Sequence, residues 1–327
     1  MKKNIAIITG GNSGEYEISL KSAKNIAENL DENLYKGYLI HLRGNSWTFT
    51  HTDNTIYNID KNDFSLTINE NKIFFDCVFI IIHGEPGENG KLQGYFDMLN
   101  IPYTGCDAAV SAVTFNKNFC NRVAASHGIK IAKSVCLFKN EDFNQDDIID
   151  EVGGLPCFVK PCNSGSSVGI SKVNKKEEFI PALQNAFEYD NQILIEQFVD
   201  GREITCGVMK INNKIQALAV TEIISKKEYF DFEAKYNPHL ADEITPAEIP
   251  SVTEVLCKNV SEKLYAIFGC RGISRMDYIY NETGLYFIEI NTIPGVTNQS
   301  IIPGQLRYLG LNFMQLCTML IQEAITR

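Results

Sequence analysis

The sequence lacks the features that mark membrane, secreted or nucleic-acid-binding proteins. Its longest uninterrupted apolar run, Cys77 to Ile82, is six residues, whereas a transmembrane helix needs about 20. The apolar run near the start stops at Thr9 and is too short for a signal peptide. Lysines form no basic block, and the net charge is −10, so a broad nucleic-acid surface is not expected. We therefore expect a cytoplasmic protein without nucleic-acid or membrane partners.

Cysteine is plentiful, but metal-type spacings are missing. None of the ten cysteines belongs to a CxxC motif, and several stand inside apolar strings: Cys77, Cys136, Cys157, Cys206 and Cys317. This pattern is typical of reduced, buried thiols in a cytosolic protein. The length of 327 residues, with 44% apolar and 21% charged residues, predicts two or three globular domains.

Two common nucleotide-binding motifs are also absent. The segment GENGK suggests a P-loop, but that motif requires glycine where Glu85 stands and serine or threonine where Leu92 stands. No GxGxxG sequence follows an expected strand. The sequence therefore supports neither a P-loop nor a dinucleotide-binding fingerprint.

One stretch, residues 153–172, nevertheless favours a phosphate site. Apolar residues lead to Lys160 and Pro161, and the segment from Asn163 to Gly169 then contains two glycines and three serines. Such a loop between two strands allows backbone N–H groups to approach an anion closely. A hairpin with a flexible turn explains the same residues, because serine-glycine turns are common.

The N-terminal third has an α/β pattern. The run from Ile5 to Ile8 predicts a buried parallel strand, and helical spacing follows from Ser19 to Leu30. Glu15 lies in the turn between them, where open α/β sheets bind ligands, although a carboxylate there also suits a helix N-terminus. The strand at 77–82 ends at His83, and residues 35–75 resemble antiparallel decoration without evident chemistry.

The remaining pattern predicts alternating helices and antiparallel strands. Asp200 and Gly201 form an expected turn, after which the chain returns as an antiparallel strand. The irregular stretch 225–250 is expected to be a lid or disordered. The expected helices are 108–125, 139–150 (or an acidic linker), 179–187, 251–268 and 315–325, and the expected strands are 193–199, 202–210, 214–224, 271–280 and 284–295.

The last two strands suggest a metal site. Strand side chains alternate, so Glu289 and Asn291 project on one face, and Arg275 and Asp277 do so on the preceding strand. If the strands pair, Asp277, Glu289 and Asn291 converge as oxygen ligands suited to Mg²⁺. A solvated polar strand face is the alternative.

Together these segments resemble the D-alanine–D-alanine ligases of the ATP-grasp superfamily over essentially the whole chain. The matching blocks, all in the same order, are GGNSGEYEISL, HGEPGENGKLQGYFDMLNIPYTG, VKPCNSGSSVGISKV, IEQFVDGREITCGV, YFDFEAKY, SRMDYIY and EINTIPGVTNQSIIP. The resemblance implies a three-domain α/β (α+β) ATP-grasp fold that begins with an open parallel α/β domain. Its domains are expected at 1–105, 106–199 and 200–327, with ATP between the antiparallel sheets of the last two.

The resemblance also implies roles for individual residues. ATP and two Mg²⁺ ions, for which Mn²⁺ can substitute, are expected, and the partners are small-molecule substrates, with a homodimer implied. The ATP-binding residues are expected to be Lys117, Lys160, Ser164, Ser166, Ser167, Val168, Glu196, Gln197, Val199, Glu203 and Lys235, and the metal ligands Asp277, Glu289 and Asn291. The catalytic set is expected to be Glu15, Ser166, Tyr236, Arg275, Gly295 and Ser300. The substrate-binding set is expected to be Glu15, His83, Arg275, Gly295, Ser300 and Ile301.

The chemistry implied is ATP-dependent formation of D-alanyl-D-alanine through an acyl phosphate, for peptidoglycan precursors. Asn89, Asn116 and the pair Asn163–Ser164 depart from the commoner family pattern, which predicts altered local hydrogen bonds in an active enzyme. The alternatives are a D-alanine–D-lactate or D-serine ligase, a different ATP-grasp carboxylate–amine ligase, and a nucleotide-binding paralogue without catalysis. Because Tyr236 carries no positive charge, we expect D-alanine rather than D-lactate as the acceptor.

Overall fold

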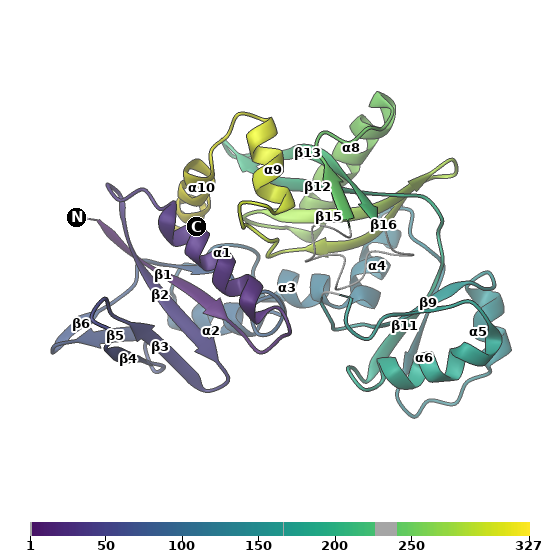
Figure 1. The fold of residues 1–327 in the computed structure, drawn as a ribbon, viewed down its shortest axis with the longest axis horizontal. Coiled ribbons are helices and arrows are strands. Elements are labelled where there is room, and N and C mark those ends of the chain that lie inside the picture. The colour runs from purple at the N-terminus through teal and green to yellow at the C-terminus, as the bar shows by residue number, and fades with distance from the viewer. Residues whose placement is uncertain (1, 166, 226–240) are drawn as a thin grey trace.

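The computed structural model describes residues 2–165, 167–225 and 241–327, and in this part of the chain the strands form three sheets (Figure 1). The sheets follow one another along the chain and contain seven, four and five strands. Within the described residues, no helix is both long and apolar enough to cross a membrane. Mixed parallel and antiparallel pairing agrees with the α/β (α+β) class predicted from the sequence.

The first sheet has the order β6-β5-β4-β3-β2-β1-β7. Its centre is parallel: β1 (Lys3–Gly10) lies between β2 (Tyr35–Arg43) and β7 (Cys77–Ile80), and every residue of β1 from Ile5 to Gly10 is buried. An antiparallel extension continues from β2 through β3 (Ser46–Thr50), β4 (Ile56–Asp60), β5 (Ser65–Ile68) and β6 (Asn71–Ile73). The helices of this unit are α1 (Tyr16–Glu28) and α2 (Lys91–Leu99).

The prediction of antiparallel decoration over residues 35–75 was wrong for β2, which is a parallel member of the central sheet. From Tyr38 onward its buried residues alternate with more exposed ones, and alternation usually indicates an antiparallel strand with one solvated face. Only β3 to β6 are the predicted decoration.

Two short helices stand where one was expected over residues 108–125. The helix α3 (Ala108–Phe115) ends at Asn116, which has an extended backbone. The Asn116 side-chain oxygen caps α4 (Lys117–Ser126) by accepting a 3.0 Å hydrogen bond from the Phe119 N–H. A small-residue helical pattern does not reveal such a break, because asparagine is tolerated inside helices as well as at caps. The break places Lys117 in the first turn of α4.

The second sheet is antiparallel and has the order β10-β9-β11-β8. As predicted, a glycine- and serine-rich loop joins two strands, β9 (Cys157–Pro161) and β10 (Ser171–Val173), which pair with each other. A separate group of buried apolar residues packs between this sheet and its helices. The other elements are β8 (Ser134–Phe138), α5 (Gln145–Glu151), the 3₁₀ turn η1 (Lys176–Glu178), α6 (Phe179–Ala186) and β11 (Gln192–Gln197).

The third sheet has the order β14-β13-β12-β15-β16 and is also antiparallel. Its strands are β12 (Arg202–Ile211), β13 (Lys214–Ser225), β14 (Ala241–Ile244), β15 (Ser274–Asn281) and β16 (Gly284–Asn291). The helices that follow or interrupt them are α8 (Ser251–Phe268), α9 (Ile301–Tyr308) and α10 (Phe313–Ile325). The helix predicted over 251–268 is confirmed, whereas α9 was not predicted.

The strand expected after Asp200 and Gly201 is antiparallel, as predicted, but it does not pair with β11. Both edges of β11 are already paired, one with β8 and the other with β9. The chain therefore crosses into the third sheet, where β12 pairs with β13 and β15. Gly201 allows this crossing, because a Cβ there would lie 2.6 Å from the Tyr280 carbonyl oxygen.

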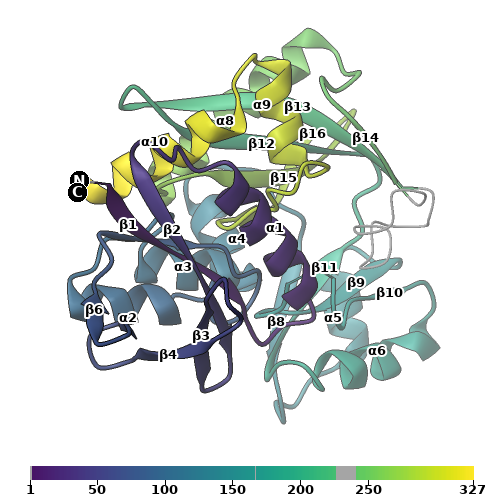
Figure 2. The ribbon, with the colours of Figure 1, turned by 60° about the vertical axis from the view of Figure 1, so that its left-hand side comes forward.

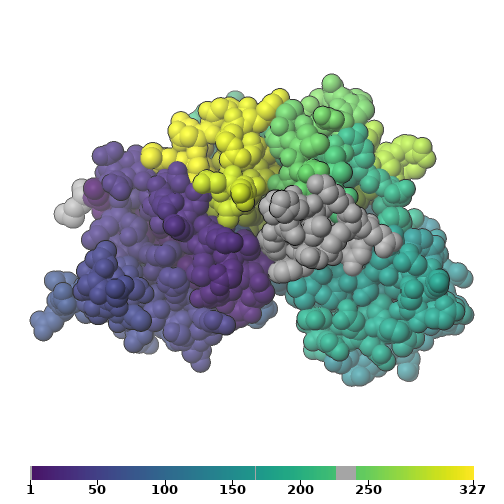
Figure 3. Space-filling view, in the orientation of Figure 1, coloured from purple at the N-terminus to yellow at the C-terminus, as the bar shows by residue number. Residues whose placement is uncertain are grey.

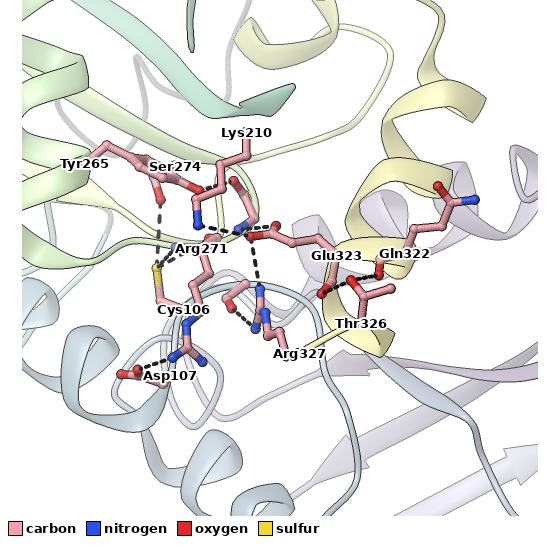
Figure 4. Close-up of polar contacts among 12 residues, drawn as sticks. Cys106, Asp107, Lys210, Tyr265, Arg271, Ser274, Gln322, Glu323, Thr326 and Arg327 are labelled. Atoms are coloured by element: carbon pink, nitrogen blue, oxygen red, sulfur yellow. Dashed lines mark hydrogen bonds and ion pairs between the residues drawn. The ribbon is translucent and has the colours of Figure 1, made fainter. Parts of the chain in front are cut away.

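A polar junction near the C-terminus ties the first and third units together (Figure 4). The Glu323 carboxylate, on α10, accepts a 2.9 Å hydrogen bond from the Gly272 N–H, and the Arg327 guanidinium donates to the carbonyls of Tyr103 and Gly105. Beside them, Arg271 forms an ion pair of 3.3 Å with Asp107. These polar contacts join the first and third units.

Candidate active site

A cavity of about 440 Å³ lies between the second and third sheets. One wall is formed by β9, β11 and the segment 198–201, and the other by β12, β13, β15 and β16. In the space-filling view the four-stranded unit is separated from the N-terminal unit by a notch (Figure 3). Ten residues predicted from the sequence to belong to the site line the cavity: Lys117, Lys160, Ser167, Glu196, Gln197, Val199, Glu203, Arg275, Asp277 and Glu289.

The two predicted phosphate lysines have carboxylate partners of their own. The Lys160 ammonium, on β9, is bonded to the Glu196 carboxylate on β11, and both side chains are nearly buried. The Lys117 ammonium donates a 2.6 Å hydrogen bond to the Ser164 carbonyl and lies 3.4 Å from the Glu289 carboxylate. The chain therefore balances its buried cations with anions, as the cost of burying a lone charge requires.

Glu196 is held from two sides. Lys160 binds one carboxylate oxygen, and the Asn121 amide of α4 donates a 3.3 Å hydrogen bond to the other. Asn121 was not predicted, and its position on the buried face of a helix gives only a weak sequence signal. Next to this pair, Gln197 joins β11 to Lys133 through backbone and side-chain hydrogen bonds.

The loop of residues 162–170, apart from Ser166, is held by local polar contacts. The Ser164 hydroxyl donates to the Val168 carbonyl at 3.3 Å, and Asp190 accepts from both the backbone and the amide of Asn163. Ser167 adopts a positive φ of 57°. Ser166, Lys235 and Tyr236 lie outside the described residues. Asn116 and Asn163, which both depart from the commoner family pattern, contact each other here, because the Asn116 amide donates to the Asn163 side chain at 3.0 Å.

The polar faces of β15 and β16 meet as predicted. In the antiparallel register Asp277 is opposite Glu289, and Arg275 is opposite Asn291. Arg275 donates two hydrogen bonds to Asp277, at 2.8 and 2.7 Å, and the Thr205 hydroxyl donates a third at 2.5 Å. Burial opposes the charge of Arg275, but the adjacent Asp277 carboxylate outweighs it and raises the pKa of the guanidinium.

These strands offer a donor set that fits Mg²⁺. Two carboxylates and the Asn291 amide oxygen are hard ligands, and Mg²⁺ binds through few carboxylates while keeping several waters. Asp277 accepts three hydrogen bonds, two on Oδ1 and one on Oδ2. The Oδ2 atom therefore keeps lone-pair capacity for a metal. In the described part of the chain, no cluster of three or more His, Cys, Asp or Glu side chains suits a metal, and the Asn291 amide adds a further oxygen donor beside the two carboxylates.

A second group of site residues lies between α1 and the loop of residues 292–300. Glu15 is buried at the N-terminus of α1, and a Cβ added to Gly165 would lie 3.1 Å from its carboxylate. The N-terminal unit therefore touches the 162–170 loop at this point. Both ring nitrogens of His83 are engaged, Nδ1 with the Ile293 carbonyl at 2.9 Å and Nε2 with the Ser22 hydroxyl at 3.2 Å.

Gly295 and Ser300 lie close together at the other end of this group. A Cβ on Gly295 would lie 3.0 Å from the Ser300 hydroxyl. That hydroxyl also bonds Thr297, and Ser300 directly precedes α9, whose first residue is the buried Ile301. The two groups of site residues are connected through β16, which carries Glu289 and ends at Asn291.

Two family models cover nearly the whole chain. The D-ala D-ala ligase N-terminus matches residues 4–106, and the D-ala D-ala ligase C-terminus matches residues 123–322. The chain belongs to the D-alanine–D-alanine ligase family. A D-alanine--D-alanine ligase from Phocaeicola vulgatus is 43% identical to it over 99% of both chains. The resemblance inferred from the sequence blocks is confirmed.

Solved structures of this ligase family share the fold. A D-alanyl-alanine synthetase A from Vibrio cholerae matches with a TM-score of 0.90 and 28% identity, covering 100% of this chain and 99% of its own. A D-Ala:D-Ser ligase from Enterococcus faecalis matches with a TM-score of 0.86 and 32% identity, covering 99% and 100%. A Bacillus anthracis D-alanine–D-alanine ligase complexed with ATP matches with a TM-score of 0.80 and 28% identity, covering 100% and 98%. The predicted ATP-grasp fold is thereby confirmed.

Proposed function

We propose that the protein joins two D-alanine molecules into D-alanyl-D-alanine while converting ATP to ADP and inorganic phosphate. The observation that carries this proposal is the convergence of Lys117, Arg275, Asp277 and Glu289 at one end of the intersheet cavity. Full-length similarity to curated ligases of this activity supports it. A paralogue that only binds nucleotide would not need this intact set.

In the first step, a carboxylate oxygen of one D-alanine attacks the γ-phosphorus of ATP, and the bond to ADP breaks. Lys160 and Lys117 would exchange their own carboxylate partners for phosphate oxygens, supported by backbone N–H groups of the 162–170 loop and by Lys235. Positioning and charge neutralisation supply most of the catalysis in phosphoryl transfer. Glu196, Gln197 and Val199 would receive the adenine base, and Glu203 the ribose.

Asp277, Glu289 and Asn291 would hold two Mg²⁺ ions. When bound, the ions neutralise phosphate charge and polarise the transferred group. Arg275 is already fixed by Asp277, so its guanidinium is oriented before substrate arrives.

In the second step, the amine of the other D-alanine attacks the acyl carbon and forms the C–N bond. The carbonyl becomes an oxyanion, and its collapse breaks the C–O bond to phosphate while the amine loses its proton. Arg275 and the Gly295 N–H would stabilise that oxyanion. Glu15, with Ser166 and Tyr236, would hold the first D-alanine and close the site, His83 would lie near its carboxylate, and Ser300 and Ile301 would bind the second.

We further propose that the chain has three domains, 1–105, 106–199 and 200–327. We also propose that the protein acts in the cytoplasm as a homodimer and supplies peptidoglycan precursors. Ten free cysteines, nine of them buried, fit a reducing compartment. Sedimentation velocity at micromolar concentration would test the dimer, since a monomer mass would reject it.

One assay tests the function. Purified protein with Mg²⁺ and ATP should release ADP only when D-alanine is added, and mass spectrometry should detect D-alanyl-D-alanine. ADP release that ignores D-alanine, or ADP without dipeptide, would reject the proposal. L-alanine is the matched control, because it has the same charge and volume.

The acceptor is a separate question, because the D-Ala:D-Ser ligase structure is also similar. Equal concentrations of D-alanine, D-serine and D-lactate at pH 7 should give mostly D-alanyl-D-alanine. A predominance of D-alanyl-D-serine or of the depsipeptide would overturn the acceptor assignment and leave the ligase mechanism intact.

A further inference from the structure

Asn25 is a buried polar residue in the last turn of α1 for which the proposed function has no role. Its side chain is only 6% exposed, and its amide nitrogen donates a 2.6 Å hydrogen bond to the Val296 carbonyl, 271 residues away. A buried amide is costly unless it is hydrogen-bonded, and asparagine is a poor helix former. The residue therefore has a local cost that its contact with the 292–300 loop offsets.

The orientation of this amide is determined by its partners. A carbonyl can only accept, so the Asn25 nitrogen must face Val296. The side-chain oxygen of Asn25 accepts in turn from the Asn29 side-chain amide, one helical turn further on, at 3.2 Å. The same Asn29 amide also donates to the backbone carbonyl of Asn25 at 2.8 Å, so Asn29 holds the donor in place.

The Val296 bond is one of several that fix the 292–300 loop. The Ile293 N–H donates to the Asn291 side chain at 3.0 Å, and the Ile293 carbonyl is bound by His83. Gly295 lies between these attachments and Val296. Within the part of the chain that the structure describes, the Gly295 N–H donates to no other group, which leaves it available to a ligand.

The loop also borders a small cavity. The cavity has a volume of about 30 Å³ and is lined mainly by apolar residues that include Phe79, Pro294, Val296 and Leu320. This volume is about that of one water molecule. If the bond to Asn25 were lost, the loop would have room to shift, and apolar contacts alone would not restore the direction of the Gly295 N–H.

We infer that Asn25 is a positioning residue for the second chemical step: by holding the Val296 carbonyl, it keeps the Gly295 N–H directed at the oxyanion. The inference rests on the proposed function. The helix that carries Asn25 begins beside Glu15, about 15 Å away at 1.5 Å per residue. Both ribbon views show α1 between the N-terminal sheet and the C-terminal unit (Figures 1 and 2). One rigid element thus sets the first D-alanine site and the oxyanion donor relative to each other.

The test is the number of ADP molecules released per dipeptide formed. In Asn25→Leu, which keeps the branching at Cγ but lacks the donor, phosphorylation should proceed while amine attack slows. Unused acyl phosphate would then hydrolyse, so the ratio should rise clearly above one. We expect kcat for the dipeptide to fall about 10- to 100-fold, because one well-placed oxyanion donor contributes about 10²- to 10³-fold. The KM for ATP should stay within about twofold of the wild-type value.

Two further variants keep the test decisive. Lys24→Leu introduces the same residue on the exposed face of the same helix and should leave kcat and the ratio unchanged. Asn25→Ser is too short to reach Val296 but stays polar, and it replaces Asn25→Leu if that variant does not fold. A merely structural role would lower the melting temperature and leave the ratio near one.

The outcomes separate the two proposals. A wild-type enzyme that forms no dipeptide would reject the proposed function and this inference with it. If the wild-type enzyme releases one ADP per dipeptide and the folded Asn25 variants keep the same ratio, the inference alone is overturned. A raised ratio in either Asn25 variant, with Lys24→Leu unchanged, would support it.

Discussion

The 162–170 loop and the 292–300 loop both border the proposed reaction site, but they are held by different forces. Charged groups hold the first, through Lys117 on the Ser164 carbonyl and Asp190 on Asn163. Neutral, buried hydrogen bonds hold the second, through Asn25 and His83. From 162 to 170 most described residues are half-exposed, whereas residues 292, 293, 294 and 296 are buried.

The difference matches what each loop is proposed to do. Charged partners can be exchanged for phosphate oxygens, so a loop held by them can adapt when ATP arrives. A loop that must present one backbone N–H in a fixed direction gains nothing from exchangeable partners, and neutral buried bonds keep it in place without competing for the substrate. Changes to charge should therefore affect ATP binding, and changes to the neutral bonds should affect the second step.

The largest effect is expected at the carboxylates of β15 and β16, which lie between the two loops in the proposed reaction. Glu289→Gln should reduce turnover by about 10³-fold or more, because a bound metal contributes several kcal/mol to transition-state stabilisation. The fold should survive, since Glu289 is partly exposed and its ion pair with Lys117 is 3.4 Å long. Steady-state kinetics over a range of Mg²⁺, with melting temperatures, would check this. Near wild-type turnover at low Mg²⁺ would remove Glu289 from the metal site.

Asp277→Asn should abolish turnover as well, but with a second consequence. Arg275 is buried and makes a two-bond ion pair with Asp277. Removing one partner of a buried pair costs about 3–5 kcal/mol of folding free energy. Chemical denaturation should therefore show Asp277→Asn to be clearly less stable than Glu289→Gln, and equal stabilities would contradict the energetic importance of that pair.

The sequence predicted the elements around this site better than their connections. Alternation correctly placed Asp277 and Glu289 on one face of paired strands, because a strand has a fixed side-chain period of two. It could not show that β12 leaves β11, because antiparallel partners depend on which strand edges are already occupied. Pattern-based reasoning is local, whereas sheet order is a property of the whole chain.

The candidate site shows the same limit. Lysines and carboxylates were identifiable by type, but their pairing in the structure was not: nothing in the sequence indicates that Lys160 meets Glu196. Asn25 and Asn121 were missed because a single buried asparagine looks like any other helical polar residue. Contacts between positions as distant as Asn25 and Val296 arise only when separate units pack together.

A smaller effect is expected at the lysine that precedes the 162–170 loop. Lys160→Ala should raise the KM for ATP by about 10- to 100-fold, since hydrogen bonds to charged groups contribute about 1.5–3 kcal/mol. Lys160→Arg keeps the charge and is the matched control, with a smaller rise. The ratio of ADP to dipeptide should stay near one in both, which would separate this loop from the other. An unchanged KM for ATP in Lys160→Ala would remove the phosphate assignment.

The smallest effect concerns a thiol beneath the 162–170 loop. Cys136, on β8, is the one cysteine of the ten that is not fully buried. Hydrogen bonding from the Cys162 thiol, which outweighs burial, lowers the pKa of Cys136 to about 6, with help from the Gln192 amide at 3.1 Å. A depressed pKa favours the thiolate, which is the reactive form, so Cys136 should be ionised above about pH 6 and protonated below it.

The alkylation of Cys136 by iodoacetamide should rise between pH 5 and 7 and then level off, whereas the alkylation of an ordinary thiol rises near pH 8.5. Peptide mapping should find this residue labelled first, and Cys136→Ser should remove the fast phase while leaving kcat nearly unchanged. Burial raises the pKa of Cys317 to about 12, and it provides the internal control because it should remain unlabelled. Equal labelling of both thiols, or a midpoint near 8.5 for Cys136, would show that the sheet under the charged loop is no more chemically responsive than the packed core.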